Sequence, residues 1–467
     1  MKKIFLSNNK TMMGLLLLAG MAASCKKLIE MPGNPPNKIQ EALQFSDSSS
    51  TMAAVAGVYS YPSNGGGSFT FNDGYLSWTT GLSSDELSTS SSTLTTVEFF
   101  NYSLTGINAT VTSLWTDPYK GLYPVNAVLN EVSQSSTLSA SFKKQIVAEM
   151  KVVRAVYYFN LVNLFGPVPV VTTTDYNISN SQPRLSVDSV YAQIVRDLTD
   201  AQQDLPATYP SAGRARPNLY TVLAFLAKVH LYRGEWQAAY DAANTVIGSN
   251  VYSLETDLNK VFLDGSKEAI WQLPATTGTQ ITREASNFIT ASGTVPVYAL
   301  TPYLVNAFES GDQRFQKWVG TSVITGSPNI YYPYKYQKIL SSDTRLEDFM
   351  IFRLAEQYLI RAEAAAHLNN NTGALADINT VRARAGLGAS TADPSSQSDV
   401  LNAVMHERQV EFFTEWGNRW FDLKRTGTAN AVLGTEKTGW QPNAALYPIP
   451  DAQILLNSNL SQNTGYN

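Results

Sequence analysis

Apolar side chains recur every three or four residues along most of the chain, and this spacing predicts a mainly helical protein. The segments with clear stripes are residues 43–61, 108–133, 142–165 and 187–205. Gly166 and Pro167 end the third of these helices, because neither residue continues a helix well. Ser186 is placed to cap the fourth, which Pro206 ends. After the first 24 residues no apolar run reaches the roughly 18 residues that a membrane-spanning helix needs.

Two segments have the pattern of a helix–turn–helix unit. The first covers residues 219–247 with a turn at Gly234, and the second covers residues 352–386 with an Asn-rich turn. Both units carry alanines at positions where two helices would pack closely: Ala224, Ala227, Ala238, Ala239 and Ala242 in the first, and Ala364, Ala365, Ala366, Ala374 and Ala376 in the second. This pattern resembles tetratricopeptide repeats and favours a scaffold of stacked helix pairs.

Residues 248–350, between the two units, have little periodicity and are rich in Tyr, Thr, Gly and Pro. We interpret them as an insertion of irregular segments and short strands, with residues 331–336 as one strand. Residues 61–75 contain three consecutive glycines and predict a loop before the second helical region. Binding groups are often carried by such segments on a rigid scaffold.

The N-terminus has the pattern of an export signal. Lys2 and Lys3 precede an apolar segment, residues 12–23, which is too short to span a bilayer. Small residues then lead to Cys25, the only cysteine, as in a bacterial lipobox. We expect residues 1–24 to be a lipoprotein signal peptide and Cys25 to be lipidated. Residues 25–40, which are rich in proline, would be the anchor and tether, and residues 41–467 a single body.

Composition narrows the functional classes. Hydrophobic residues make up 44% of the chain, enough for a packed core and too many for a disordered protein. The formal net charge is -4, so electrostatics give no reason to expect a nucleic-acid partner. Only 15% of the residues are charged, against roughly 25% in an average soluble domain.

Motifs for metal or cofactor chemistry are missing from the sequence. His406 and Glu407 begin like a zinc-binding helix, but Val410 stands where the second histidine would be. Phosphate-binding glycine loops and nucleophile elbows are also absent. We therefore expect no metal, no cofactor and no catalytic residue.

Acidic residues leave one enzymatic alternative open. A glycosidase needs two carboxyl groups roughly 5–10 Å apart, and Asp85 with Glu86 is the most suggestive pair. A helix cap with a solvated neighbour is the simpler interpretation. A last long helix is predicted to carry Arg408, Glu411, Glu415, Arg419 and Asp422 on one face, with Glu407 beside them. Their alternating charge favours a structural ladder of ion pairs.

Four longer stretches carry a family resemblance. They are RAVYYFNLVNLFGPVPVV (154–171), RAEAAAHLNNNTGALADINTVRARAGL (361–387), ERQVEFFTEWGNRWFDLKRTG (407–427) and LYPIPDAQILLNSNLSQNTGY (446–466). In this order, and behind a lipobox, they resemble the SusD/RagB family of Bacteroidetes outer-membrane lipoproteins.

The resemblance implies an all-α SusD-like fold with tetratricopeptide-like helix pairs and irregular loop and short-strand insertions. It implies a non-catalytic role: capture of an oligosaccharide at the cell surface and delivery to a TonB-dependent, SusC-like transporter. The protein would then be lipid-anchored in the outer membrane and would face the cell exterior. The same resemblance leaves room for a peptide ligand, or for a lid that binds no ligand itself.

Aromatic and amide side chains in irregular segments are the candidates for ligand binding, because sugar rings stack on flat aromatic faces. The candidates are Asn72, Asp73, Tyr75 and Trp78 in the first loop, and Tyr298, Trp318, Tyr331 and Tyr332 in the insertion. Four other tryptophans lie on helical stripes and are assigned to packing: Trp115, Trp236, Trp416 and Trp420. If the chain were instead a glycosidase, Asp85, Glu86 and Asp312 would be the acids to test.

Overall fold

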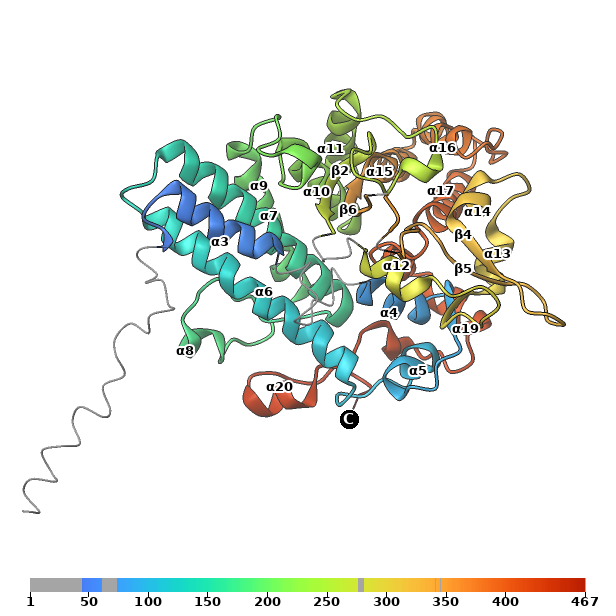
Figure 1. Ribbon diagram of the computed structural model, residues 1–467, viewed down its shortest axis with the longest axis horizontal. Helices are drawn as coiled ribbons and strands as arrows, with labels where there is room; N and C mark the ends of the chain where they lie inside the picture. The colour runs from blue at the N-terminus through green and yellow to red at the C-terminus, as the bar shows by residue number, and fades with distance from the viewer. Residues whose placement is uncertain (1–43, 61–73, 276–280, 341, 345, 467) are drawn as a thin grey trace, which may run out of the picture.

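The computed structural model describes residues 44–60, 74–275, 281–340, 342–344 and 346–466 (Figure 1). The predicted signal peptide, the lipidation site Cys25 and the tether lie outside these residues, as do the candidates Asn72 and Asp73. None of the helices in the described ranges combines the length and the apolar character that crossing a membrane requires.

Long helices packed side by side form the scaffold, as the periodicity predicts. They are α3 (Ser48–Ser60), α6 (Ala109–Gln134), α7 (Ala140–Phe165), α9 (Val187–Asp204), α10 (Leu219–Tyr232), α11 (Trp236–Gly248), α15 (Leu354–His367), α16 (Asn371–Arg384) and α17 (Gln397–Phe412). Helices α6, α7, α9, α10 and α11 pack on one another in sequence order. Figure 1 shows this row running from α3 and α6 on one side to α10 and α11.

Local sequence explains where these helices begin and end. Asn108 caps α6 by accepting hydrogen bonds from the backbone amides of Thr110 and Val111, at 2.9 and 3.0 Å. Ser186 accepts a bond from the amide of Ser189 and caps α9, as predicted. Helix α7 ends at Gly166, whose φ of 72° disfavours a residue with a side chain.

The two predicted helix pairs, α10–α11 and α15–α16, are present and pack directly against each other through α11 and α15. Ala227, Ala239 and Ala243 of the first pair share a buried cluster with Ala364 of the second. Trp236 stacks on His367 across the same contact, with ring centroids 3.7 Å apart. The scaffold is therefore continuous in space although about a hundred residues separate the pairs in sequence.

Those intervening residues form the predicted insertion, which contains short antiparallel strand pairs. Strand β2 (Ala269–Pro274) pairs with β6 (Asp348–Arg353), and β4 (Val319–Ser322) with β5 (Ile330–Pro333). Strand β3 (Tyr298–Leu300) pairs with β1 (Leu87–Thr89), which precedes the insertion in sequence. The helices between them are short: α12 (Arg283–Phe288), α13 (Pro302–Ala307) and α14 (Gln313–Trp318). The β2–β6 pair lies at the base of the insertion, because its strands come soon after α11 and directly before α15. Phe352 belongs to β6, so the predicted helix of the second unit begins two residues later than expected.

Two expectations about helices are wrong. Tyr75 and Trp78 do not lie in a loop, because residues Tyr75–Ser83 form helix α4. The predicted last long helix is broken after Phe412 and resumes as α18 (Asn418–Arg425). Thr414, Trp416 and Gly417 have φ values of 53°, 53° and 71°, which turn the chain between the two helices. Trp416 is thus a turn residue rather than part of a helical stripe.

The remaining described helices are α5 (Leu94–Asn101), α8 (Tyr176–Ser179), α19 (Ala429–Glu436) and α20 (Asp451–Leu456). Figure 1 shows α4 and α5 below the insertion, close to α12 and α19. Residues from Phe45 to Leu460 share one hydrophobic core cluster, so the N-terminal and C-terminal parts of the described chain pack together.

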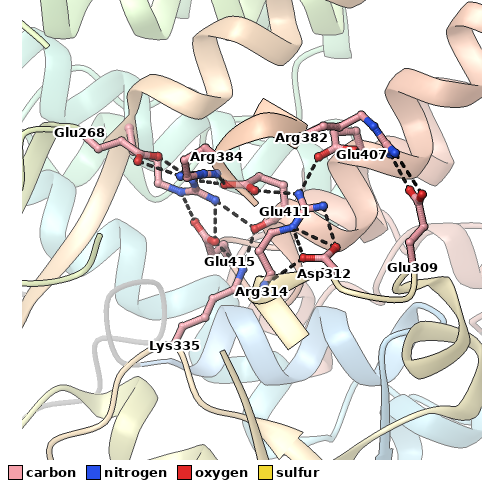
Figure 2. Close-up of polar contacts among 11 residues, drawn as sticks. Glu268, Glu309, Asp312, Arg314, Lys335, Arg382, Arg384, Glu407, Glu411 and Glu415 are labelled. Atoms are coloured by element: carbon pink, nitrogen blue, oxygen red, sulfur yellow. Dashed lines mark hydrogen bonds and ion pairs between the residues drawn. The ribbon is translucent and has the colours of Figure 1, made fainter. Parts of the chain in front are cut away.

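A buried network of charged side chains joins the insertion to the scaffold (Figure 2). We call it the Glu411 network; its members are Glu268, Glu309, Asp312, Arg314, Lys335, Arg353, Arg382, Arg384, Glu407, Glu411 and Glu415. The Glu411 carboxylate accepts from Arg314 of α14 at 3.0 Å, from Arg353 of β6 at 2.5 Å and from Arg384 of α16. The predicted ladder is therefore structural, but its cations come mainly from other elements.

Glu411 remains ionised although it has no exposed surface. Burial alone would raise the pKa of its carboxyl group, but the three arginines outweigh that effect and lower the pKa well below its usual range. Neighbouring carboxylates neutralise those arginines in turn, as when Glu407 pairs with Arg314 at 2.6 Å. Such a network tolerates burial because each charge has an opposite partner.

Candidate functional site

Aromatic rings from α4, α12 and β3 gather where the insertion meets the N-terminal helices. Trp78 stacks on Tyr298 with ring centroids 5.3 Å apart and planes 21° apart. Tyr75 lies against Trp78 at 5.6 Å, and Phe288 contacts Tyr298 edge-on at 5.9 Å. We call Tyr75, Trp78, Phe288 and Tyr298 the aromatic platform. The structure thus brings together three of the predicted ligand-binding residues, which are far apart in sequence.

Only part of the platform is accessible. Tyr75 is 37% exposed, whereas Trp78 and Tyr298 are 4% and 9% exposed. Tyr75 is therefore the accessible ring of the platform; Trp78 lies against it, and Tyr298 lies against Trp78. Tyr75 and Trp78 are three residues apart on one helix, so their side chains are neighbours on the same face.

A tight turn between α4 and β1, which we call the corner, fixes the position of α4 relative to β3. Strand β1 follows α4 after three buried polar residues, Ser84, Asp85 and Glu86, and then pairs with β3, which carries Tyr298. Thr301, directly after β3, donates from its backbone amide to the Glu86 carbonyl at 2.9 Å, and its hydroxyl donates to the Asp85 carbonyl. The corner is therefore bonded to β3 at its backbone.

The side chains of this corner are bonded to the C-terminal helices. The Asp85 carboxylate accepts two hydrogen bonds from Arg419 of α18, at 2.8 and 2.6 Å, and one from Gln409 at 3.2 Å. Lys437, after α19, donates to the Leu82 and Leu87 carbonyls at 2.9 and 3.4 Å, one on each side of the corner. These bonds fix α4, and with it Tyr75, to the body of the protein.

Glu86 occupies a less favourable position at the same corner. Its carboxyl group is buried and accepts one hydrogen bond from the Thr414 amide at 3.2 Å. Burial, and then the adjacent Asp85 carboxylate, raise the pKa of Glu86 to about 8, so the group is largely protonated at neutral pH.

The other candidates from the insertion do not join the platform. Tyr331 and Tyr332 lie on β5; Tyr331 is half-buried beside Phe315, and Tyr332 covers Gly320 of the paired strand and is 9% exposed. Any side chain at Gly320 would meet the Tyr332 ring, since a Cβ there would lie 2.3 Å from it.

Trp318 corrects an expectation, because it has no exposed surface. Its indole nitrogen donates to the Leu258 carbonyl at 3.0 Å, and Lys335 lies 5.0 Å from its ring centroid. A ring buried in this way cannot stack on a ligand in this conformation. Trp318 is a packing residue at the centre of the insertion, close to the Glu411 network.

The acids that a glycosidase would need are also buried. Asp85, Glu86 and Asp312 are each 1–2% exposed. Asp312 caps α14 and pairs with Arg314 at 2.8 Å, and Asp85 pairs with Arg419. These carboxylates therefore have structural partners and no access to a sugar in this conformation. Among the described residues, no group of three or more His, Cys, Asp or Glu side chains is arranged to hold a metal ion.

A small cavity beneath the platform is lined by Glu284, Phe288, Pro333, Lys335, Tyr336 and Thr414. It has room for about one water molecule and none for a sugar ring.

Sequence reasoning missed Phe288 and the role of Asp85 with Arg419. Phe288 ends a short helix within an aperiodic segment, and no local pattern marks it as a partner of Tyr298. Asp85 and Arg419 are more than 300 residues apart in sequence, so only the folded chain reveals their pairing.

Comparisons with known proteins agree with this architecture. Residues 281–466 match a family described as the SusD family, and residues 50–231 match one described as "Starch-binding associating with outer membrane". A SusD superfamily protein from Bacteroides vulgatus superposes with a TM-score of 0.79 at 20% identity, over 90% of this chain and all of the other. A laminarin-binding SusD-like protein superposes with a TM-score of 0.75 at 24% identity, over 90% of this chain and all of the other.

Curated relatives extend the match along the sequence. SusD-like protein P2 of Formosa agariphila is 26% identical over 428 residues, which cover 79% of this chain and 83% of the relative. The starch-binding protein SusD of Bacteroides thetaiotaomicron is 25% identical over 411 residues, covering 68% of this chain and 72% of that protein. With its all-helical scaffold, its strand-containing insertion and these matches at both ends, the chain belongs to the SusD/RagB family.

Proposed function

We propose that this protein is a non-catalytic receptor that captures an oligosaccharide at the cell surface and delivers it to a TonB-dependent, SusC-like transporter. The observation that carries the proposal is the aromatic platform, whose exposed Tyr75 ring is held rigidly by Trp78 and Tyr298. A flat, preorganised ring suits the apolar face of a sugar, because little conformational entropy is lost on binding. The printed names of similar proteins, one laminarin-binding and one starch-binding, support a glycan ligand.

Membrane attachment and the transporter partner are parts of the same proposal. They rest on the lipobox at Cys25, on the family resemblance and on the matched description that mentions the outer membrane. Residues 41–467 would act as one body on the tether of residues 25–40. Affinity purification from detergent-solubilised outer membranes tests the partner, and recovery of the protein without any TonB-dependent transporter would contradict it.

Ligand binding is tested with the soluble chain from residue 26 onward and a panel of oligosaccharides and peptides. Intrinsic fluorescence is a suitable signal because Trp78 lies directly beneath Tyr75. We expect saturable binding of a glycan, and we expect Tyr75→Ala to weaken it about tenfold, since one stacking contact contributes about 1.4 kcal/mol.

Tyr176→Ala is the matched control, because Tyr176 is an equally polar ring, 72% exposed, on the distant helix α8. It should leave the dissociation constant unchanged. Binding of peptides alone would move the ligand to that class, and failure of the whole glycan panel would overturn the proposal.

A further inference from the structure

The segments that surround the platform contain no charged side chain and no histidine. They are residues 75–84, 87–97, 285–300 and 319–334. The first segment is buried apart from Tyr75, so its lack of charge is ordinary for a core helix. The other three have exposed positions, and since 15% of the residues in the chain are charged, each would ordinarily contain at least one charged residue. The polar groups that these segments do carry are hydroxyls and amides from Ser, Thr, Tyr and Asn.

These four segments are contiguous in the folded protein, and we call them the uncharged surface. The first and second are α4 and the β1–α5 region, and the third is paired with the second through β1 and β3. Ser90 extends this contact, since its amide donates to the Val297 carbonyl at 3.1 Å and its hydroxyl to the Pro296 carbonyl at 2.9 Å. The fourth is the β4–β5 hairpin, which lies beside β3 and is bonded to the third where Ser322 donates to Thr294 at 2.6 Å.

Charged residues next to these segments in sequence are buried or half-buried, except Lys317, which is exposed two residues before the fourth segment. Asp85 and Glu86, between the first two segments, are each 1% exposed. Glu284 and Lys335, just before the third and just after the fourth, are 3% and 6% exposed. Lys335 is bound to Glu415 at 2.5 Å. Glu98 is half-buried and accepts a hydrogen bond from Asn108 at 2.6 Å, and Arg283 is half-buried.

An anionic ligand would lack partners on such a surface. Removing a carboxylate or sulfate from water is costly unless a charged or strongly donating group replaces the lost hydration. Arg and Lys usually supply this, often through paired hydrogen bonds. The net charge of -4 would further disfavour a polyanion. Neutral sugar hydroxyls, in contrast, are well matched by hydroxyls and amides beside an aromatic ring.

We propose that the uncharged surface selects uncharged oligosaccharides and discriminates against glycans that carry uronate or sulfate groups. This inference rests on the proposed function and names the ligand class of the same site.

The test compares neutral and anionic oligosaccharides of similar length on the soluble chain. Laminarihexaose and maltoheptaose represent the neutral class within a wider panel, and oligogalacturonate and sulfated galactan fragments represent the anionic class. We expect saturable binding within the neutral class alone. The dissociation constant should change less than about twofold between 20 and 300 mM NaCl, because no charge pair is screened.

The outcomes separate the two hypotheses. Binding of an anionic glycan that weakens with salt would overturn the selectivity and leave glycan capture standing. Failure of every glycan in both classes would overturn both proposals.

A charge-gain variant tests the surface itself. Ser286 is exposed on α12, whose Arg283 and Asn287 abut Gly74 just before Tyr75. Ser286→Lys should add salt-dependent binding of oligogalacturonate, at least fivefold above the wild type, while neutral binding persists. Thr245→Lys, at an exposed site on α11, is the matched control and should add none. Equal gains in both variants would mean that the lysine acts through net charge alone, which would contradict a local role for the surface.

Discussion

At the scale of single residues, chemical type alone did not decide which side chains face solvent. Tyr75, Trp78 and Trp318 are all aromatic residues in weakly periodic sequence, yet they are 37%, 4% and 0% exposed. Buried acids also differ from one another: Glu411 has three arginine partners, whereas Glu86 accepts one backbone hydrogen bond beside another carboxylate. The environment therefore sets the charge state of each carboxyl group, and for Glu86 it favours the protonated, neutral form.

Ionisation of Glu86 should consequently lower the free energy of unfolding as the pH rises. Its pKa is about 8 in the folded protein, above the ordinary value of 4.5 for a glutamate. Between pH 4.5 and pH 8 the folded state therefore keeps a proton that the unfolded state has lost. The contribution of this group to stability is fully present below about pH 4.5 and is lost as the pH rises through 8. Glu86→Gln cannot ionise, and the amide oxygen can still accept from Thr414. Relative to the wild type, the variant should therefore gain roughly 3–4 kcal/mol between pH 5 and pH 8.

Urea unfolding of both proteins at the two pH values measures this difference directly. The prediction concerns the change with pH, which cancels any constant effect of the substitution. A difference in unfolding free energy that is the same at pH 5 and pH 8 would show that Glu86 ionises normally in the folded state.

At the scale of elements, the platform depends on how α4, β1 and β3 are held together. Helix α4 supplies Tyr75 and Trp78, strand β3 supplies Tyr298, and the corner at Asp85 connects them. Asp85 is a positioning residue in this arrangement, because its partner Arg419 belongs to α18 and neither side chain is part of the platform.

Asp85→Asn should loosen this corner and weaken glycan binding severalfold. The variant leaves Arg419 without its carboxylate partner, and loss of a buried ion pair of this kind costs about 3 kcal/mol. Asp197→Asn is the matched control, because Asp197 accepts two similar bonds from Arg154, at 2.9 and 2.6 Å, between α9 and α7. Both variants should lose comparable stability, but only Asp85→Asn should change the dissociation constant.

Hydrogen–deuterium exchange supplies a readout that needs no ligand. We expect faster exchange in residues 75–89 for Asp85→Asn and unchanged exchange there for Asp197→Asn. If both variants bind glycan equally well and exchange alike in this segment, Asp85 has no positioning role.

At the scale of the whole molecule, the Glu411 network couples two parts of different character. The scaffold is built from stacked helix pairs, and the insertion is built from short helices, short strands and turns. Arg314, Lys335 and Arg353 of the insertion meet Glu407, Glu411 and Glu415 at the end of the scaffold (Figure 2). The insertion therefore owes its position to buried charge pairs as well as to apolar packing.

Glu411→Gln should be strongly destabilising, by about 3–5 kcal/mol, because it removes one buried charge opposite three arginines. Glu309→Gln is a control at the rim of the same network, where the Glu309 side chain is 43% exposed and paired with Arg382. It should cost less than about 1 kcal/mol, since solvent screens such a pair. Equilibrium unfolding in urea distinguishes the two. Equal losses for both variants would contradict a central role for Glu411.

The sequence by itself determined the helical scaffold, because helix periodicity, caps and helix-ending residues are local properties. Ser186, Gly166 and most of the alanines of the two helix pairs act in the structure as their patterns predict, whereas Ala376 is exposed. Four sequence stretches also sufficed to predict the family. Only the tertiary structure decided the break at 413–417, the burial of Trp318, and the meeting of Trp78 with Tyr298. These features arise from contacts between segments distant in sequence, where packing and paired charges outweigh local preference.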